Sequence, residues 1–322
     1  MKAIRVHFTA TESTLRMDEV PKPEPVADQI VIRAQAIGLN RADLGRRRMA
    51  QPGQPEQPAT PGLDVAGSVE AVGAEVRGWR RGDQVMALVR GAYAEYVATR
   101  AVTAYHPPRG MRMTDAASLP CVFLTAYYAL TKLAGLKRGE TVLIHAAGSG
   151  VGMAGIQIAH ALGARVLTSA GSDERVARGR QLGAEAGVNY SSQDVTMELN
   201  RLTGGRGVNV VLDSVGGSIF DATLKALAPG GRIVTVGGPA GPRTAYDEGA
   251  LTAKGQWVKP MTVFAEAQAD TEQKGWAQLK AWFESGTLRT VVQQVMPWTQ
   301  AEAAQKLLTD RGVFGKIVMT VG

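Results

Sequence analysis

In the first part of the chain, apolar residues occur in short runs or alternate with polar residues, as is typical of β-strands. The runs that predict strands lie at 2–7, 29–37, 63–72, 83–88 and 92–97. Between them, Pro-Gly at 61–62 and Arg-Gly-Asp at 81–83 predict turns. We therefore expect an all-β domain of irregular barrel type before about residue 120.

From residue 113 onward the apolar spacing becomes helical, and an apolar-rich helical segment is expected at 116–136. Expected strands follow at 141–145, 165–168, 208–212, 232–236 and 256–258. Expected helices lie at 173–182 and 219–227, and further helices at 271–285 and 299–310 precede a last strand at 316–321. Strands that alternate with helices predict a parallel, doubly wound sheet.

The strand expected at 141–145 leads into a glycine-rich turn and a helix that ends at Gly163. Small residues permit a tight turn, and a helix N-terminus offers N–H groups to a pyrophosphate. This pattern predicts a dinucleotide-binding turn, with a turn that is rich in glycine only for packing as the alternative. The expected contacts are Ala147, Gly148, Ser149, Gly150, Val151 and Gly152.

Composition indicates a globular protein of two domains. The 322 residues are 45% hydrophobic and 20% charged, and no apolar run is long enough to span a membrane. No signal peptide is visible, and the single cysteine, Cys121, suits a reducing compartment. The net charge of +7 includes the run Arg46, Arg47 and Arg48. We interpret this run as a solvated face and leave open a role near a phosphorylated cofactor. We expect a cytoplasmic protein that binds neither membranes nor nucleic acid.

Several further segments resemble the zinc-free quinone oxidoreductases of the medium-chain dehydrogenase/reductase superfamily, near the zeta-crystallin type. These segments are GLNRADL (38–44), PGLDVAGSVEAVG (61–73), GDQVMAL (82–88), GAYAEY (91–96), LPCVFLTAYYAL (119–130), LGAEAGVNY (182–190), VLDSVGG (211–217) and GKIVM (315–319). Each is a weak signal, but their order over nearly the whole chain is specific. The resemblance implies an α/β fold with two domains, usually found as a homodimer. We expect a GroES-like irregular β-barrel domain at 1–121 and 263–322, and a Rossmann domain with a doubly wound parallel sheet at 122–262.

The resemblance also permits a test for zinc. Zinc-dependent relatives use a cysteine, a His-Glu pair and a second Cys or Asp for the catalytic metal, and four clustered cysteines for a structural one. This chain has one cysteine, and Leu63-Asp64 stand where His-Glu would. We therefore predict that neither zinc site forms, and that the hydride acceptor is itself electrophilic.

Asn40 is the predicted catalytic residue. By resemblance it lies beside the nicotinamide and the substrate, where its amide could donate to a substrate carbonyl; a turn-forming asparagine is the alternative. Asp43 is expected either to be solvated at a helix start or to be a structural partner in the same loop. Arg46 and Gln51 stand where relatives often carry aromatic rings, which predicts a more polar substrate pocket.

The residues after the strand expected at 165–168 predict a preference for NADPH. An NAD enzyme usually has an acidic residue at this strand end to hold the ribose diol, whereas this chain has Ala170. Gly171 and Ser172 leave room for a 2′-phosphate, and Arg175 could reach it. The acidic residues at 173–174 are interpreted as helix-start residues that suit the helix dipole.

The remaining cofactor assignments rest mainly on the resemblance. The resemblance implies that Thr125 lies near the nicotinamide ribose. An equally open alternative is a buried hydroxyl that bonds to the backbone of its own helix. Tyr190 is implied near the adenosine phosphate, or else is a strand-end aromatic residue. Gly237 and Gly238 end a strand at the sheet edge where ligands bind. Lys316 could lie close to the cofactor, but we favour a solvated lysine.

These inferences predict an NADPH-dependent oxidoreductase that transfers a hydride to a quinone or a similar conjugated carbonyl acceptor without zinc. No residue stands out as an obligatory general acid, which suits quinones because water can protonate their reduced oxygens. One alternative is an enoyl or 2-alkenal reductase of the same superfamily. Another is an NADPH-binding regulatory or RNA-binding protein with little turnover.

Overall fold

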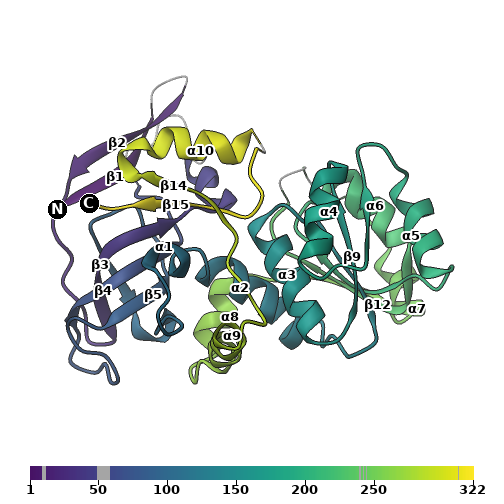
Figure 1. The fold of residues 1–322 in the computed structure, drawn as a ribbon, viewed down its shortest axis with the longest axis horizontal. Helices are drawn as coiled ribbons and strands as arrows, with labels where there is room; N and C mark the ends of the chain where they lie inside the picture. The colour runs from purple at the N-terminus through teal and green to yellow at the C-terminus, as the bar shows by residue number, and fades with distance from the viewer. Residues whose placement is uncertain (9–11, 49–58, 239–240, 242, 244, 311) are drawn as a thin grey trace. The chain divides into compact units, whose positions relative to one another are not determined.

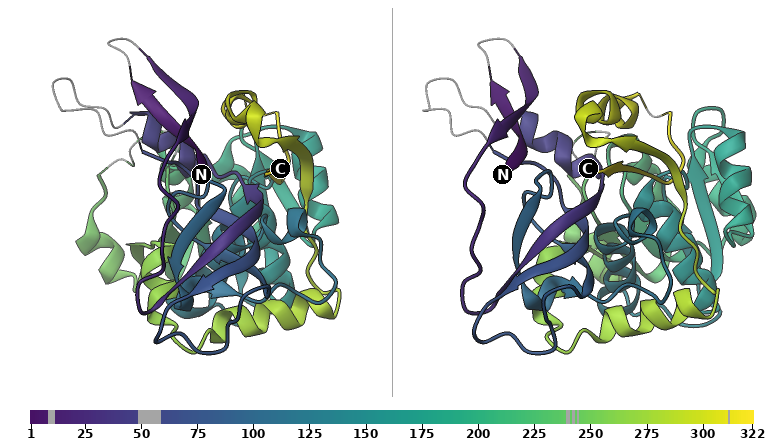
Figure 2. Two further views of the ribbon diagram at one scale, coloured as in Figure 1. Left: turned by 90° about the vertical axis from the view of Figure 1, so that its left-hand side faces the viewer. Right: turned by 60° about the vertical axis from the view of Figure 1, so that its left-hand side comes forward.

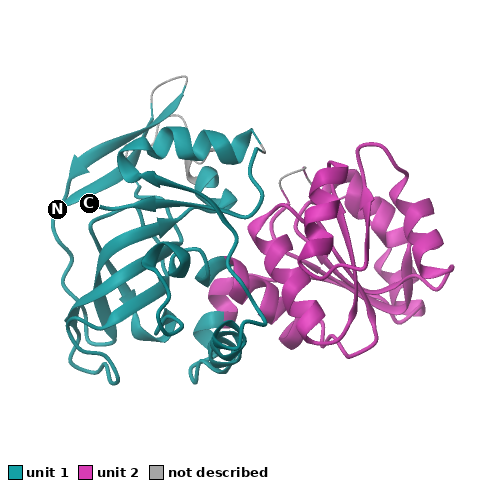
Figure 3. Cartoon of the chain, in the orientation of Figure 1, with its two compact units in different colours: residues 1–121, 267–322 teal, residues 122–266 magenta. Residues whose placement is uncertain are grey.

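The chain folds into two compact units in the computed structural model. The structure describes residues 1–8, 12–48, 59–238, 241, 243, 245–310 and 312–322. Unit 1 comprises Met1–Cys121 and Ala267–Gly322, and unit 2 comprises Val122–Glu266 (Figure 3). Unit 1 is therefore assembled from both ends of the chain, and unit 2 from its middle.

A mixed sheet forms the centre of unit 1 (Figure 1). Its strand order is β14-β15-β3-β4-β5-β7, with β6 also paired to β3. The strands are β3 (Gln29–Gly38), β4 (Asp64–Val72), β5 (Gln84–Leu88), β6 (Tyr96–Arg100), β7 (Ala104–Tyr105), β14 (Val292–Pro297) and β15 (Lys316–Thr320). Because β15 runs antiparallel to β3 and pairs Val318 with Gly38, the end of the chain borders the strand that leads to Asn40.

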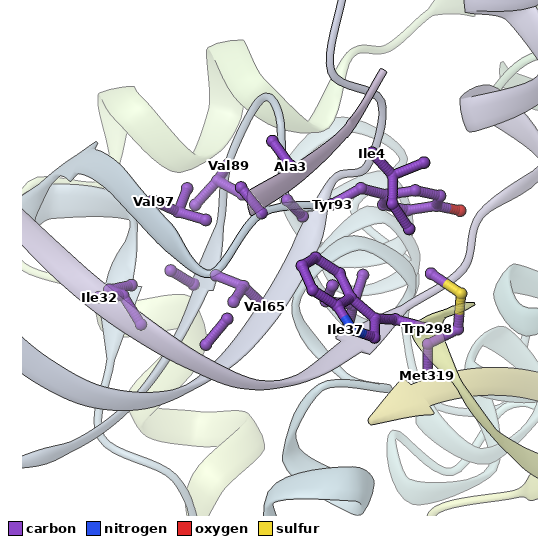
Figure 4. Packing of buried hydrophobic residues seen from close by; sticks show 14 of the residues in the cluster. Ala3, Ile4, Ile32, Ile37, Val65, Val89, Tyr93, Val97, Trp298 and Met319 are labelled. Carbon is purple, nitrogen blue, oxygen red and sulfur yellow. The ribbon is translucent and has the colours of Figure 1, made fainter. Parts of the chain in front are cut away.

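The core of unit 1 joins residues that are far apart in the sequence. Trp298 and Met319 belong to the same buried cluster as Ile4, Ile37 and Val65 (Figure 4). Ile4 comes from β1 (Lys2–Phe8), which pairs with β2 (Ser13–Glu19) in a separate antiparallel ribbon (Figure 2). The short helices are η1 (Arg41–Arg48), η2 (Ala101–Thr103), α1 (Met113–Ala116), α9 (Lys274–Glu284), η4 (Trp298–Gln300) and α10 (Ala301–Thr309).

Unit 2 contains the predicted doubly wound parallel sheet, in the order β10-β9-β8-β11-β12-β13. The strands are β8 (Thr141–Ile144), β9 (Arg165–Ala170), β10 (Ala186–Asn189), β11 (Val208–Asp213), β12 (Leu227–Thr235) and β13 (Trp257–Pro260). The helices are α2 (Pro120–Tyr127), η3 (Tyr128–Leu133), α3 (Gly150–Ala161), α4 (Asp173–Gln181), α5 (Val195–Thr203), α6 (Gly217–Lys225), α7 (Glu248–Ala253) and α8 (Val263–Ala269), of which α2 and α8 cross the unit boundaries. In the described part of the chain, we find no helix with the length and apolar character needed to cross a membrane.

The helical segment expected at 116–136 is broken into shorter pieces. Helix α1 ends at Ala116, α2 begins at Pro120, and the chain continues as the π-helical segment η3. Proline at the first helical position lacks only an N–H that would have no partner there, so Pro120 starts a helix without cost. The apolar pattern thus identified the helical character of the segment but not its interruption.

Strand positions differ from the predictions at several places. The strand expected at 92–97 lies at Tyr96–Arg100. Strand β12 begins at Leu227, although the sequence predicted a strand only from residue 232. Strands β2 and β14 were not predicted, because much of each is exposed and apolar alternation is weak. Half-exposed edge strands carry little of the burial pattern on which such predictions depend.

Candidate active site

Most of the predicted cofactor residues meet at one edge of the parallel sheet in unit 2. The carboxyl ends of parallel strands share an edge, and residues 147–152, 171–175, 190 and 237–238 follow β8, β9, β10 and β12. Strands β9 and β10 lie on one side of β8, while β11, β12 and β13 lie on the other. The crevice where strand order reverses is the usual ligand site in such folds, so this arrangement fits a dinucleotide.

The turn after β8 is held in a conformation that only small residues permit. Ala146 has a φ of +57°, and a Cβ atom added to Gly152 would lie 2.1 Å from the Ala146 carbonyl oxygen. The Ser149 hydroxyl accepts a hydrogen bond of 2.9 Å from the Gly152 N–H and caps α3. That bond uses an oxygen lone pair and leaves the hydroxyl hydrogen available to donate, so the cap is compatible with a phosphate contact.

Small residues also line the turn after β9, where Ala170 is buried at the strand end. A Cβ atom added to Gly171 would lie 3.2 Å from the ring of Tyr190, so glycine allows this close approach. Ser172 caps α4, in which Arg175 is the third residue. Asp173 is the first residue of α4, which agrees with its interpretation as a helix-start residue. Its carboxylate accepts a 2.9 Å hydrogen bond from the Asn189 amide.

Asp213 and Arg243 connect the ends of β11 and β12, and the sequence did not predict this pair. Asp213 accepts hydrogen bonds from the N–H groups of Val215 (2.9 Å) and Gly216 (3.0 Å), and the Arg243 Nε lies 2.9 Å from its other oxygen. The Arg243 guanidinium also donates to the Gly237 carbonyl at 2.8 Å. Burial by itself raises the pKa of Asp213, but His145, the two N–H donors and Arg243 outweigh it and hold that pKa below its ordinary value.

A buried polar cluster in unit 1 contains the predicted catalytic residue. The Asn40 amide nitrogen donates to Asp64 Oδ2 at 2.8 Å and to the Gly38 carbonyl at 3.3 Å. Its amide oxygen accepts from the Lys316 ammonium at 2.7 Å. Since both amide hydrogens have partners within the protein, a substrate carbonyl would have to replace the longer contact, with Gly38.

Lys316 is buried, so our interpretation of it as a solvated lysine was wrong. Its ammonium donates to the Leu39 carbonyl (2.7 Å), to Asn40 Oδ1 (2.7 Å) and to Asp64 Oδ2 (3.0 Å). Strand β15 places it there because it pairs with the end of β3. The sequence offered no local signal for this position, as Lys316 and Asn40 are 276 residues apart.

Asp43 is the structural partner in its loop rather than a solvated residue. Its Oδ2 accepts from the Asn40 backbone N–H at 2.9 Å and from the Tyr93 hydroxyl at 3.1 Å, while its Oδ1 is buried without a partner. Burial raises the pKa of Asp43 to about 7, despite the lowering effects of the Asn40 N–H and Lys316. Burial likewise raises the pKa of the Tyr93 hydroxyl, so this phenol stays protonated.

For the other predicted site residues that it describes, the structure gives mainly the element in which each one lies. Thr125 is buried in α2. Arg46 lies in the 3-10 helix η1, and Gln51 falls outside the described residues. For all predicted site residues, the contacts with substrate or cofactor stay predictions.

Among the residues that the structure describes, no group of three or more His, Cys, Asp or Glu side chains could hold a metal ion. The Asp64 carboxylate, which stands at the expected position of the zinc-binding pair, is instead bonded to Lys316, Asn40 and the Cys121 N–H. An ammonium group next to this carboxylate opposes the binding of a second cation there.

Comparisons with known proteins cover nearly the whole chain. Residues 26–109 match the family model described as alcohol dehydrogenase GroES-like domain, and residues 150–281 match the one described as zinc-binding dehydrogenase. A quinone oxidoreductase of Sus scrofa is 34% identical over 323 residues, which span 99% of this chain and 97% of the relative.

Solved structures agree with this similarity. A quinone oxidoreductase of Escherichia coli, crystallised with NADPH, covers 100% of both chains with a TM-score of 0.89 at 29% identity. The CurK enoyl reductase covers 99% of both chains with a TM-score of 0.86 at 28% identity. Identity above 30% over the whole length confirms the predicted family and fold class. The chain belongs to the quinone oxidoreductases of the medium-chain dehydrogenase/reductase superfamily.

Proposed function

We propose that this protein transfers a hydride from NADPH to a quinone or a similar conjugated carbonyl acceptor. One observation carries the proposal: the sheet edge of unit 2 has a glycine-lined turn before a helix N-terminus, and a buried alanine, Ala170, at the ribose position. The full-length similarity to quinone oxidoreductases, one of them crystallised with NADPH, supports it.

The residues at this edge fit NADPH. Gly152 permits close backbone approach, and α3 is long enough for its N-terminus to attract a pyrophosphate. The nearby Asp173 carboxylate accepts a hydrogen bond of 2.9 Å from the Asn189 amide. Because Ala170 is uncharged, we propose that a 2′-phosphate would meet Gly171, Ser172 and the basic Arg175 after this strand end.

When bound, NADPH supplies a hydride from C4 of its nicotinamide. We propose that Asn40 donates an N–H to the acceptor oxygen, where negative charge develops during hydride transfer. Thr125, Tyr190 and Gly237–Gly238 are proposed to contact the cofactor, with Arg46 and Gln51 near the substrate. The reduced oxygens of a quinone can take protons from water, so the residues need not include a general acid.

An enoyl or 2-alkenal reductase is the second candidate, and the similarity to an enoyl reductase favours keeping it. A regulatory or RNA-binding protein with little turnover is the third. We further propose that the protein is a cytoplasmic homodimer; analytical ultracentrifugation would contradict this if it showed monomers only.

The deciding experiment measures NADPH oxidation with a panel of quinones, enals, enones and enoyl thioesters. We expect quinones to give the highest kcat/KM. Faster turnover of enoyl substrates would favour the second candidate. Tight NADPH binding without turnover of any acceptor would favour the third, and RNA binding would then be measured at several salt concentrations.

A further inference from the structure

Asn40 lies between two buried side chains that have opposite hydrogen-bonding character. On one side the Lys316 ammonium lies 2.7 Å from the amide oxygen of Asn40, and on the other Asp64 Oδ2 lies 2.8 Å from its amide nitrogen. Lysine can only donate hydrogen bonds, and an ionised carboxylate can only accept them. A flipped amide would place NH2 against ammonium and oxygen against carboxylate, and would thus lose both contacts.

The cluster leaves Lys316 no alternative arrangement. The three N–H groups of its ammonium have three acceptors, on Leu39, Asn40 and Asp64. Asp64 is equally committed, because its Oδ1 accepts from the Cys121 N–H at 2.7 Å. Lys316 and Asp64 are both buried, so water does not compete for these bonds. Removing either partner alone would leave a buried charge without compensation.

We propose that the Lys316–Asp64 ion pair is a positioning device that fixes the orientation of the Asn40 amide, so that Asn40 presents an N–H, and never its oxygen, to the substrate. The amide hydrogen directed to the Gly38 carbonyl, at 3.3 Å, makes the weakest contact of the cluster and is the one that a ligand can take over. The ligand class that fits is an oxygen that only accepts hydrogen bonds, such as the carbonyl of a quinone or enone. This inference rests on the proposed function, since it requires Asn40 to act on the acceptor.

A charge-free variant tests the proposal without leaving a buried charge. In Lys316→Met/Asp64→Asn, the new amide at position 64 can donate to the oxygen of Asn40, which favours the flipped orientation. Replacement of a buried ion pair by neutral groups is often close to neutral for stability, so we expect the variant to fold. The matched control is Lys306→Met/Asp310→Asn, which removes an exposed lysine–aspartate pair of 2.7 Å.

We expect the charge-free variant to lower kcat with a quinone by roughly ten- to a hundredfold, as for the loss of one donor to a developing oxyanion. Its Kd for NADPH should stay within about twofold of wild type, because the Asn40 N–H is proposed to contact the acceptor and not NADPH. The control should retain wild-type kcat. A change in the NMR signal of the Asn40 side-chain NH2, assigned through Asn40→Ala, should accompany the loss.

The double-mutant cycle with Asn40→Ala separates positioning from a structural role. Asn40→Ala alone should lower kcat by roughly a hundredfold, and the charge-free changes should then add less than about twofold, since residues that act as a unit are not additive. Losses that multiply would show that the pair acts independently of Asn40 and would overturn the proposal. A charge-free variant with wild-type kcat would also overturn the proposal. In that case, a low kcat of Asn40→Ala would still support the proposed function. An Asn40→Ala variant with full turnover would remove Asn40 from the reaction and overturn this inference, leaving the acceptor panel to judge quinone reduction.

Discussion

Single buried residues in unit 1 show how charge is tolerated away from water. Asp64 accepts hydrogen bonds at both oxygens and faces a lysine, whereas Asp43 has one buried oxygen without a partner. A buried carboxylate with an unpaired oxygen is costly, and protonation relieves that cost. Burial therefore raises the pKa of Asp43 to about 7, because the Asn40 N–H, Lys316 and Tyr93 offset only part of the cost.

The raised pKa of Asp43 predicts a pH-dependent stability. The pKa moves from 3.8 to about 7, so between these values the folded protein keeps a proton that the unfolded chain loses. The free energy of unfolding therefore falls as pH rises through this window, and the whole penalty is present above about pH 7. A shift of this size corresponds to at most about 4 kcal/mol.

Asp43→Asn should remove this dependence while keeping an oxygen for Asn40 and Tyr93. We expect urea unfolding to show that the variant gains stability relative to wild type as pH increases from 4 to 7. Tyr93→Phe deletes one donor to the Asp43 carboxylate and should raise the pKa of Asp43 further. In this variant, the loss of stability should therefore extend to higher pH than in wild type. Parallel stability curves for wild type and Asp43→Asn would contradict the raised pKa.

We also predict that single residues determine the cofactor preference. If Arg175 bonds a 2′-phosphate, Arg175→Ala should weaken NADPH by roughly ten- to a hundredfold, the value of one charge-assisted contact, and leave NADH nearly unchanged. Ala170→Asp should shift preference toward NADH by offering an acceptor to the ribose diol. The measurement is the ratio of Kd values for the two cofactors in each protein.

A matched control for Arg175 is Arg180→Ala, an exposed position in the last turn of α4. It should leave both affinities unchanged. The assignment of Arg175 fails if its replacement weakens both cofactors equally, or if wild type binds NADH as tightly as NADPH. High salt should reduce the preference, since Arg175 is only half-buried.

At the scale of elements, the strand–turn–helix unit from β8 to α3 depends on close backbone approach. Gly152 faces the Ala146 carbonyl, which cannot move without opening the turn, whereas Gly155 faces side-chain methyl groups of Ile144 and Leu212. The two glycines lie in the same helix but have neighbours of different rigidity. The turn, rather than the helix, is therefore the sensitive part of the unit.

This contrast predicts different outcomes for two similar substitutions. In Gly152→Ala the new Cβ would lie 2.1 Å from a backbone oxygen, which should cost about 1–3 kcal/mol of stability by analogy with overpacking and weaken NADPH at least tenfold. In Gly155→Ala, contacts near 3.0 Å to side chains can relax, and alanine gains about 0.5–1 kcal/mol of helix stability. Thermal unfolding and NADPH titration measure both. Equal effects would show that the carbonyl contact does not limit the turn.

At the scale of the whole molecule, the chain combines a mixed sheet built from both termini with a parallel sheet built from the middle. One matched family model is named for zinc binding. In this chain, however, the corresponding carboxylate of Asp64 is already bonded to an ammonium group. Electrophilic acceptors such as quinones need no Lewis acid. The proposed reaction is therefore compatible with the cluster of Asn40, Asp64 and Lys316, in which the carboxylate faces an ammonium group.

We therefore predict that the enzyme needs no metal. Exhaustive dialysis against a chelator should leave quinone reduction and the melting temperature unchanged, because no metal–ligand bond contributes to either. Elemental analysis should find well below one zinc per chain. One tightly bound zinc per chain, with turnover lost on its removal and restored on its return, would contradict the prediction.

The sequence alone determined the features that depend on neighbours along the chain. Two such local features are the strand, small-residue turn and helix at 141–163 and the uncharged residue at 170. They can be predicted locally because turn conformation and helix capping involve residues a few positions apart. Together with the order of the family motifs they were sufficient to predict the fold class. They also selected residues that the structure places at one edge of the parallel sheet.

Only the tertiary structure decided which polar residues meet. Lys316 reaches Asn40 across 276 residues because the sheet of unit 1 brings β15 and β3 together. Tyr93 reaches Asp43 across 50 residues. Likewise Arg243 reaches Asp213 from a connecting segment with no pattern of its own. Periodicity reports whether a side chain is buried but not which partner it finds. A lysine in an apolar strand therefore looked like a surface residue until the packing of the sheet supplied three acceptors for its charge.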